Sequence, residues 1–434
     1  MSHDPPSFPR LKAPSDDGAT LIWPGPEQIL RDTVENHRRL SAAADVRIQN
    51  APLPELRKNM RILLGHEDSR PLLASGHQTE LYHPGVWSKD ALILHAAARI
   101  GGRGLHLAVE TDVPKHLELR WPGVSLPITD DPARATAAWC GQLASPPTQW
   151  LDQLDAAGGV LDHFGFHPML PELLSALRSQ SAQHKSLSAA LAGATHQIDL
   201  SLGLAHGTVL VSSILSSAPY LALVHHCMSR PHEIAAGYNG SLDDFRRQSG
   251  TTNPMRPMPD LFASDDSIET PFWLDDLHAG TRTRPSVFRC GSQWVLKLVA
   301  GAEFVFDPSA GADDAAAELR DWLALNNCRI APRALTLTMF VRLLLADQFV
   351  HGIGGARYDH VADRVIARCF GIAAPAFCVT TATLHFPTAV GRTPACLPCV
   401  RHEGHQLKHR VLGAQKRDLI SQIAGLPRAS SDRA

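Results

Sequence analysis

The densest group of chemically capable side chains lies between residues 75 and 90, in the run Ser-Gly-His-Gln-Thr-Glu-Leu-Tyr-His-Pro-Gly-Val-Trp-Ser-Lys-Asp. Histidine can transfer protons near neutral pH, glutamine can orient a carbonyl or phosphate group, and lysine can pair with an anion. We predict that His77 acts as an acid or base and that Gln78 orients the substrate. The substrate-binding candidates in this run are Gly76, Glu80, His83 and Lys89.

The alternative for this run is a polar surface loop that turns at Pro84 and Gly85. Tyr82 and Trp87 argue against it, because two large aromatic side chains are unusual in a loop that contacts only solvent. An apolar run that ends at Ala74 predicts a preceding strand, and residues 88–100 are typical of a helix with Ser88 as its N-cap. Strand-to-helix loops are where parallel α/β sheets bind ligands.

A second candidate group, Glu110-Thr111-Asp112, follows an apolar strand at 105–109. Side chains two residues apart in a strand face the same way, so Glu110 and Asp112 are expected to act together on an amine or a metal. His116 joins them as a substrate-binding candidate. Alternatively, Asp112 only opens the turn before Pro114, and the sequence leaves both explanations open.

The third group is the glycine-rich run at 352–359, Gly-Ile-Gly-Gly-Ala-Arg-Tyr-Asp. Glycine inside a helix costs about 1 kcal/mol relative to alanine, so the run predicts a loop that opens a helix at 356–369. Backbone amides at a helix start can bind an anion. The substrate-binding candidates are Gly354, Gly355, Arg357 and Asp359, and a tight turn without a ligand is the alternative.

The fourth group lies near the C-terminus and comprises Cys396, Cys399, His402 and His405. Two thiolates and two imidazoles can complete a tetrahedral zinc site, and the Cys-x-x-Cys spacing is its usual first half. We therefore predict a possible zinc cofactor here. The alternative is a solvated basic tail with incidental cysteines.

Composition restricts the partners. Among 434 residues, 41 Lys and Arg nearly balance 43 Asp and Glu, so no overall field attracts nucleic acid or an anionic membrane. The first residues lack the basic and apolar regions of a signal peptide, and no apolar run reaches the length of about 20 residues that a membrane helix needs. We expect a cytoplasmic protein that acts on a small molecule, and a homodimer remains open.

The elements that position these groups predict an α/β fold, because a strand, a helix and a strand at this spacing form a βαβ unit of a parallel sheet. The fold class that we expect is a Rossmann-like parallel sheet core with a helical insertion and a short antiparallel piece at 286–298. Helices are also predicted at 26–47, 312–325 and 338–350. The expected organisation is a mobile arm at 1–25, a first core part at 26–131, a helical insertion at 132–197, a second core part at 198–390 and a Cys/His segment with a helix at 391–434.

The order of these motifs resembles that of the cysteine-adding enzymes of bacillithiol biosynthesis. The resemblance rests on Gly76-His77-Gln78 with Pro84-Gly85 and Lys89, on Glu110-Thr111-Asp112, and on the segment Arg342 to Asp347 followed by Gly354-Gly355. It implies a Rossmann-like core with a helical addition, and it adds Arg342 and Asp347 to the substrate-binding residues. It also implies the addition of cysteine to a glucosaminyl-malate acceptor. In that family a glutamine stands at the position of His77.

We therefore expect a ligase-like or transferase-like enzyme that carries out a condensation on a small polar metabolite. Whether a nucleotide takes part is left open. One alternative is a metal-dependent hydrolase whose site combines the loop histidines with Asp112. Another is a catalytically degenerate member of the family that binds a nucleotide or metabolite without converting it.

Overall fold

The computed structural model describes most of the chain between residues 11 and 386. The described ranges are 11–67, 69–121, 124–131, 143–159, 161, 168–255, 257–291, 293–298 and 301–386, with single positions at 413, 415, 418, 419 and 422. Cys396, Cys399, His402 and His405 lie outside the described residues, so the predicted zinc site stays a prediction from the sequence.

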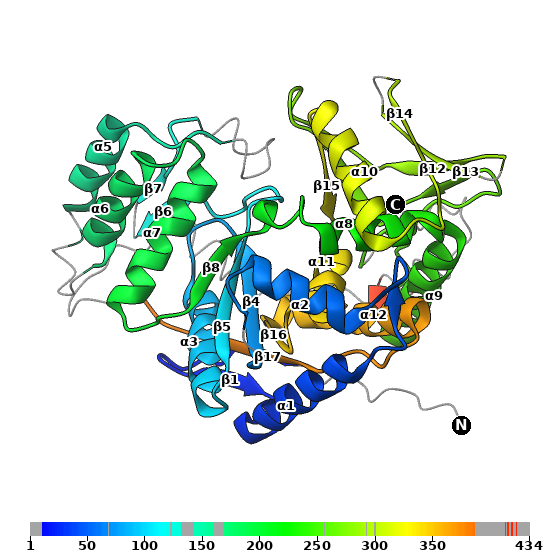
Figure 1. Cartoon of the computed structure of the whole chain (residues 1–434). Coiled ribbons are helices and arrows are strands. Elements are labelled where there is room, and N and C mark those ends of the chain that lie inside the picture. The colour runs from blue at the N-terminus through cyan, green and yellow to red at the C-terminus, as the bar shows by residue number, and fades with distance from the viewer. Residues whose placement is uncertain are drawn as a thin grey trace.

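A six-stranded sheet forms the centre of the molecule (Figure 1). Its strands, in spatial order, are β1 (Thr20–Trp23), β17 (Phe377–Ala382), β16 (Gln348–His351), β4 (Leu72–Gln78), β5 (Arg103–Val109) and β8 (Gly207–Leu210). All neighbouring pairs are parallel except β1 with β17. The predicted α/β class with a Rossmann-like parallel core is confirmed.

Helices cover both faces of this sheet because its strands are apolar on both sides. The helices are α1 (Pro26–Ala42) and α3 (Pro84–Arg99) on one face, and α2 (Leu53–Leu63), α8 (Ala218–Ser229) and α12 (Ile353–Phe370) on the other. Leu73 of β4 packs beneath α1 and α3, whereas its neighbours Leu72 and Ala74 belong to the larger core on the opposite face. The alternation of side chains along β4 thus assigns consecutive residues to different cores.

The order of the strands creates a crevice beside β4. From β4 the chain passes through α3 to β5, and it later returns to the other side of β4 as β16 before passing through α12 to β17. Since α3 and α12 cover opposite faces, the chain leaves the carboxyl ends of β4 and β16 toward opposite faces of the sheet. Such a switch point is where open α/β sheets bind their ligands.

The helical insertion has a core of its own. It contains the hairpin β6 (Glu118–Trp121) and β7 (Val124–Pro127), followed by the helices α5 (Thr148–Gly158), α6 (Leu170–Ser181) and α7 (Leu187–Ser201). Leu154, Leu174 and Leu191 are buried in a cluster separate from the main core. Figure 1 shows this unit at the left of the sheet.

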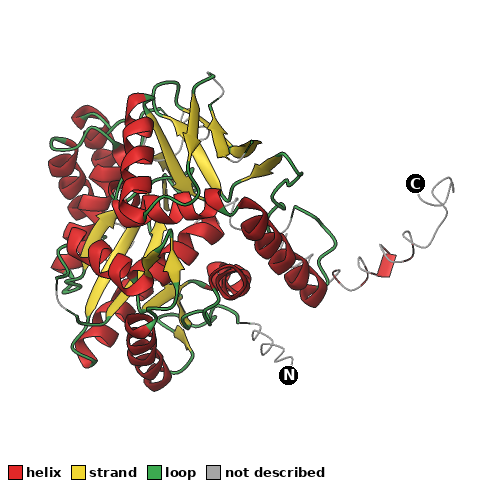
Figure 2. Cartoon of the chain, turned by 45° about the vertical axis from the view of Figure 1, so that its right-hand side comes forward, coloured by secondary structure: helices red, strands yellow, loops and turns green. Residues whose placement is uncertain are grey.

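Antiparallel strands form a third part, visible with the other strands in yellow in Figure 2. One sheet has the order β14 (Glu303–Phe306), β13 (Gln293–Lys297), β12 (Ser286–Cys290) and β9 (Ser267–Glu269), and another has the order β11 (Thr281–Thr283), β10 (Phe272–Asp276) and β15 (Cys328–Pro332). Further elements are β2 (Arg47–Ile48), β3 (Ala51–Pro52), the short helix η3 (Val211–Ser213), α9 (Pro231–Ser249) and α10 (Ala312–Leu325). The hairpin predicted at 286–298 is confirmed by the pairing of β12 with β13.

Several predicted elements were wrong in part. The helix predicted at 26–47 ends at Ala42. Residues 20–23 form β1 and pair with β17, so they are not part of a mobile arm. Helix α3 begins at Pro84 with His83 as its N-cap, several residues before the predicted N-cap Ser88. Gly354 and Gly355 lie in the first turn of α12, which begins at Ile353, and do not form a loop before it.

The predicted helix at 338–350 is replaced by three elements. Helix α11 (Ala334–Phe340) continues as a π-helical turn, η4 (Val341–Leu345), and β16 follows. The chain becomes extended at Ala346, and the amide of Asp347 donates to the carbonyl of Leu72 at the start of β4. Pairing with β4 and β17 therefore overrides the helical pattern of this apolar stretch.

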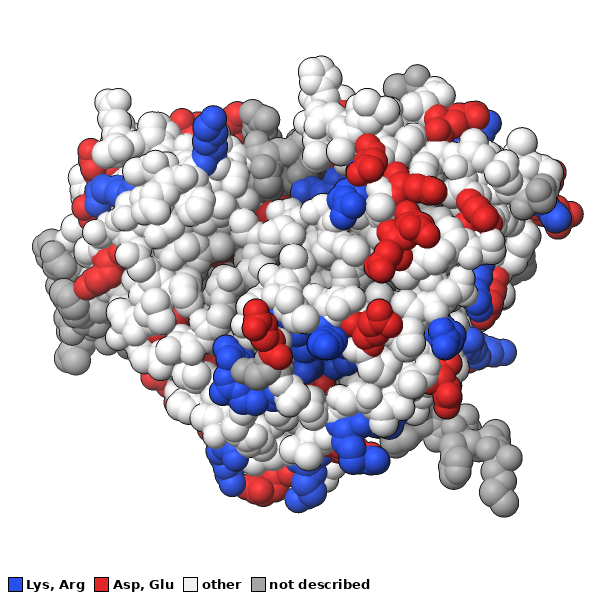
Figure 3. Space-filling model, in the orientation of Figure 1, with Lys and Arg blue, Asp and Glu red and all other residues white. Residues whose placement is uncertain are grey.

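The molecular surface carries both signs of charge. On the face shown in Figure 3, Lys and Arg lie interspersed with Asp and Glu, and neither sign covers the face. In the described part of the chain, no helix is long and apolar enough to cross a membrane.

Candidate functional site

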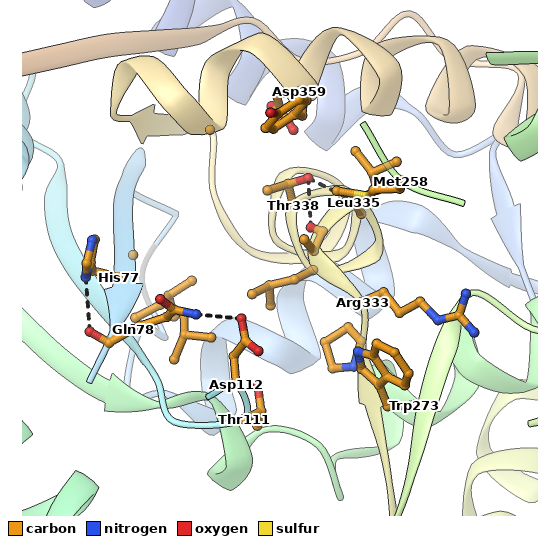
Figure 4. Close-up of a pocket in the computed structure, with 18 of the residues that line it drawn as sticks. His77, Gln78, Thr111, Asp112, Met258, Trp273, Arg333, Leu335, Thr338 and Asp359 are labelled. Atoms are coloured by element: carbon orange, nitrogen blue, oxygen red, sulfur yellow. Dashed lines mark hydrogen bonds between the residues drawn. The ribbon is translucent and has the colours of Figure 1, made fainter. Parts of the chain in front are cut away.

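A cavity of about 490 Å³ lies at the switch point. The carboxyl ends of β4 and β16 border it, as do the turn after β5 and the start of α12. The three-stranded sheet and α11 close it from the other side. Figure 4 shows these elements surrounding the cavity.

The wall from β4 and β5 is polar only at its end. Gly76 and Gln78 of β4 pair with Leu107 and Val109 of β5, and all four border the cavity. The Gln78 amide donates to the Asp112 carboxylate at 2.6 Å (Figure 4). A Cβ on Gly76 would lie 3.3 Å from the Leu107 carbonyl oxygen, so glycine keeps these strands close. Gln78 and Asp112 thus form one polar pair at the cavity wall.

His77 is directed to the other face of the sheet, as expected from side-chain alternation. Its ring leaves β4 on the side opposite to Gln78 (Figure 4) and packs edge-on against Tyr82 at 5.5 Å between ring centroids. Burial, reinforced by the charge of Lys89, lowers the pKa of His77 to about 3. The imidazole is therefore neutral at physiological pH. His77 is nevertheless one of the residues that border the cavity.

A second histidine, His351 at the end of β16, lies in the cavity wall together with Asp359 of α12. The Nε2 atom of His351 is 2.8 Å from the Asp359 carboxylate, which also accepts from Arg342 at 2.6 Å. Burial opposes the charge on Asp359, but Arg342 and His351 outweigh it and hold the pKa of this carboxyl below its usual value. A charged Asp359 fixes the His351 proton on Nε2 and leaves Nδ1 as a base.

Gly355 makes room for His351. A Cβ at this position would lie 3.0 Å from the Nδ1 atom of His351, so a larger residue would press on the ring. Both residues border the cavity. This close approach gives Gly355 a physical role beside the base.

The wall opposite carries positive charge on an aromatic surface. The guanidinium carbons of Arg282, Arg284 and Arg333 lie 5.5, 5.9 and 4.9 Å from the ring centroid of Trp273. Arg282 pairs with buried Asp275, and Arg333 pairs with Glu269. Arg284 is the most solvent-accessible of the three, with 44% of its side chain exposed and a longer contact of 3.9 Å to Glu269. This surface, the arginine–tryptophan wall, suits an anionic group.

Lys89 and Glu80 are buried outside this cavity. The Lys89 ammonium donates to the Gly76 carbonyl at 2.6 Å, and burial lowers its pKa to about 8. Glu80 accepts from the backbone amides of Lys115 and His116 at 2.7 and 3.0 Å. Lys89 therefore ties α3 to β4, and Glu80 ties the loop between them to residues 115 and 116.

The predicted pairing of Glu110 with Asp112 is wrong, because β5 ends at Val109 and the next residues turn. Glu110 is buried and accepts from the amide of Ser212 at 2.8 Å. Asp112 alone of the two carboxylates borders the cavity. The common face expected for residues two apart requires a strand that does not continue this far.

Arg342 and Asp347 are also held by protein groups. Arg342 is buried between Asp359, Asp363 and the carbonyl of Pro375. Asp347 accepts from Arg57 at 2.6 Å and from Arg61 at 2.8 Å, and its pKa is about 2 because these charges and His37 outweigh the effect of burial. Asp347 lies at the amino end of β16, away from the cavity.

The other predicted residues lie elsewhere. His83 and His116 border a second cavity, of about 520 Å³, between the β4–α3 loop and the helical insertion. Gly354 and Arg357 are exposed and are not among the residues that border the first cavity. Of the predicted site residues, six come together there, namely Gly76, His77, Gln78, Asp112, Gly355 and Asp359.

Sequence reasoning missed His351, Trp273 and the three arginines. His351 was hidden because its strand was read as the end of a helix. The run Thr281-Arg282-Thr283-Arg284 carried a usable signal, since alternate residues of an extended chain share a face. Nothing in the sequence indicated that this face would meet β4.

The fold and the cavity thus define an α/β protein with a binding crevice at the switch point of its sheet. Comparison with protein-family models and with curated proteins found no match to this chain. The function must therefore be inferred from the residues of the cavity.

Proposed function

We propose that this protein is a ligase-like or transferase-like enzyme that carries out a condensation on a small polar metabolite with an anionic group. The observation that carries the proposal is the cavity at the switch point, where the arginine–tryptophan wall faces the polar pair Gln78 and Asp112. Its volume of about 490 Å³ is in the range of pockets for metabolites.

Each wall has a role in this proposal. Arg282, Arg284 and Arg333 hold the anionic group against Trp273. Asp112, oriented by Gln78, accepts hydrogen bonds from the amine that reacts. His351 removes the proton of that amine as it attacks, so the acid–base role moves from His77 to a histidine held by a charged carboxylate.

Cysteine is the carboxyl donor that the motif resemblance implies, and the acceptor supplies the amine that reacts. Joining its carboxyl group to an amine of the acceptor forms an amide and releases water, which requires an activated carboxyl group. ATP supplies that activation in this proposal: the carboxyl group is joined to a phosphate of ATP, and one carboxyl oxygen leaves with that phosphate when the amine attacks. The product then has the mass of the acceptor plus cysteine minus water.

A metal-dependent hydrolase receives less support. Among the described residues, the group that could hold a metal is His196, Asp199 and His206, and it does not include His77, His83 or Asp112. A binder without chemistry is the remaining alternative, and it predicts a retained ligand that is never converted.

The test is a comparison of wild-type protein with Asp112→Ala, each incubated with a small-molecule cell extract, cysteine and ATP. Asp112 is exposed, so this variant should fold normally, which circular dichroism checks. We expect mass spectrometry to find a wild-type product at acceptor plus cysteine minus water, with loss of ATP, and none with the variant. Binding of a metabolite without any new product would overturn the proposal.

A further inference from the structure

We propose that His196, Asp199 and His206 form a binding site for a divalent transition-metal ion of the zinc class. Their potential ligand atoms all lie within 4.8 Å of one another. Two imidazoles and one carboxylate are a usual protein ligand set for such an ion, with a fourth position left for water or a ligand. The site is separate from the cavity of the proposed function and does not depend on it.

The local fold brings the three side chains together. His196 and Asp199 are three residues apart on α7, so they share one face of the helix. The chain then turns, with the amide of Leu204 donating to the carbonyl of Asp199, and His206 immediately precedes β8. The group therefore joins the last helix of the insertion to the edge strand of the central sheet.

The distances suit a metal after a small adjustment. Ligand atoms of a tetrahedral zinc site lie roughly 3.3 Å apart. The Nε2 atom of His206 is already 3.2 Å from an oxygen of Asp199. The ring of His196 is only partly buried and packs 5.6 Å from that of His206 between centroids, so a side-chain rotation can complete the set.

Outer hydrogen bonds orient the ligands, as they do in metal sites. The Nδ1 atom of His206 lies 3.0 Å from the carbonyl oxygen of Gly207, an arrangement that leaves Nε2 for the ion. The second oxygen of Asp199 accepts from the indole nitrogen of Trp87 at 2.8 Å. The hydroxyl of Thr208 contacts the His196 ring at 3.2 Å. A simple buried His–Asp pair would explain two of these residues but not the third histidine.

Burial favours a bound ion over a solvated cluster. Asp199 and His206 are 2% and 5% exposed, whereas His196 is the more accessible member. A cation can therefore enter from the His196 side and keep one open coordination position there. Binding would clamp α7 to β8 and, through Trp87, to α3.

The experiment uses the full chain with Cys396→Ser and Cys399→Ser as the background, so that the C-terminal cysteines cannot contribute. Zn²⁺ binding is measured by calorimetry and elemental analysis, and Co²⁺ is used for its visible absorption spectrum. We expect about one equivalent of metal and a melting temperature that rises with Zn²⁺ concentration.

Variants then locate the site. His196→Ala and Asp199→Asn should each weaken Zn²⁺ binding at least hundredfold, and Trp87→Phe should weaken it about tenfold through the lost outer hydrogen bond. His184→Ala is the matched control, because His184 is an exposed histidine of the same helical unit and should leave binding unchanged. Circular dichroism checks the fold, and His196→Ala decides the question if Asp199→Asn does not fold.

Two results would overturn the proposal. One is the absence of bound Zn²⁺ and Co²⁺ in the Cys396→Ser and Cys399→Ser background. The other is binding of unchanged affinity in His196→Ala.

Discussion

The two faces of the central sheet use adjacent residues of β4 for different purposes. Gly76 and Gln78 face the cavity with its arginine–tryptophan wall, whereas Ser75 and His77 face α3. The residues of this stretch therefore have two roles: those on one face border the cavity, and those on the other face hold α3 against the sheet.

On the α3 face, polar side chains form hydrogen bonds with one another. Asp90 accepts from the Ser75 hydroxyl at 2.6 Å and contacts Nδ1 of His106 at 2.7 Å, while Nε2 of His106 lies 2.8 Å from the Tyr82 hydroxyl. Burial opposes the charge on Asp90, but His106 and Ser75 outweigh it and lower its pKa to about 2. Such a network specifies how α3 sits on the sheet. The cavity face differs because its charged groups border open space.

The largest expected effect concerns the end of the sheet away from the cavity. Asp347→Asn leaves Arg57 and Arg61 buried without their full counter-charge, and we expect the free energy of unfolding to fall by about 3–5 kcal/mol. Urea denaturation measures the loss, and exposed Asp45→Asn is the control with little effect. A stable Asp347→Asn protein that has lost ligand affinity would instead place Asp347 in the site.

The next effect tests the support role of Lys89. Burial holds its pKa at about 8 instead of 10.5, so between these pH values the unfolded chain binds more protons than the folded one. Stability attributable to Lys89 should therefore rise with pH across this window, by up to about 3 kcal/mol. Denaturation at pH values of about 7.5 and about 10.5 should show this rise in wild type relative to Lys89→Met. If stability changed equally with pH in wild type and Lys89→Met, the Lys89 side chain would be solvated and not buried.

A smaller effect tests the cavity face. Arg284→Gln should raise the KM of the condensation about tenfold with little change in kcat, because one charge-assisted contact to the anionic group is lost. Arg289→Gln, an exposed arginine on β12 outside the cavity, is the matched control. Equal KM values for the two variants would show that the arginine–tryptophan wall does not bind the substrate.

The sequence predicted the β4–α3–β5 unit well because each element carries its own local signal. It could not predict β16, whose four residues continue an apolar stretch that also fits a helix. That strand exists because it pairs on both sides. It was missed together with His351, the residue on which the proposed chemistry now depends.

The site, too, was predicted only where its residues carry a local signal in the sequence. Gln78 and Asp112 were found because they lie at or just beyond the carboxyl ends of neighbouring strands. Trp273 and its arginines come from a separate antiparallel sheet, and only the tertiary fold brings them opposite β4. Arg342 and Asp347 were expected to bind substrate because of the motif resemblance, yet each is held by buried ion pairs.

The central claim is that chemistry occurs on the cavity face, and the same substitution on the two faces tests it most directly. In the condensation assay, we predict that His351→Gln lowers kcat about hundredfold or more, while His77→Gln stays within about tenfold of wild type. Both variants should keep the wild-type circular dichroism spectrum. A His77→Gln enzyme without activity beside an active His351→Gln enzyme would contradict the account.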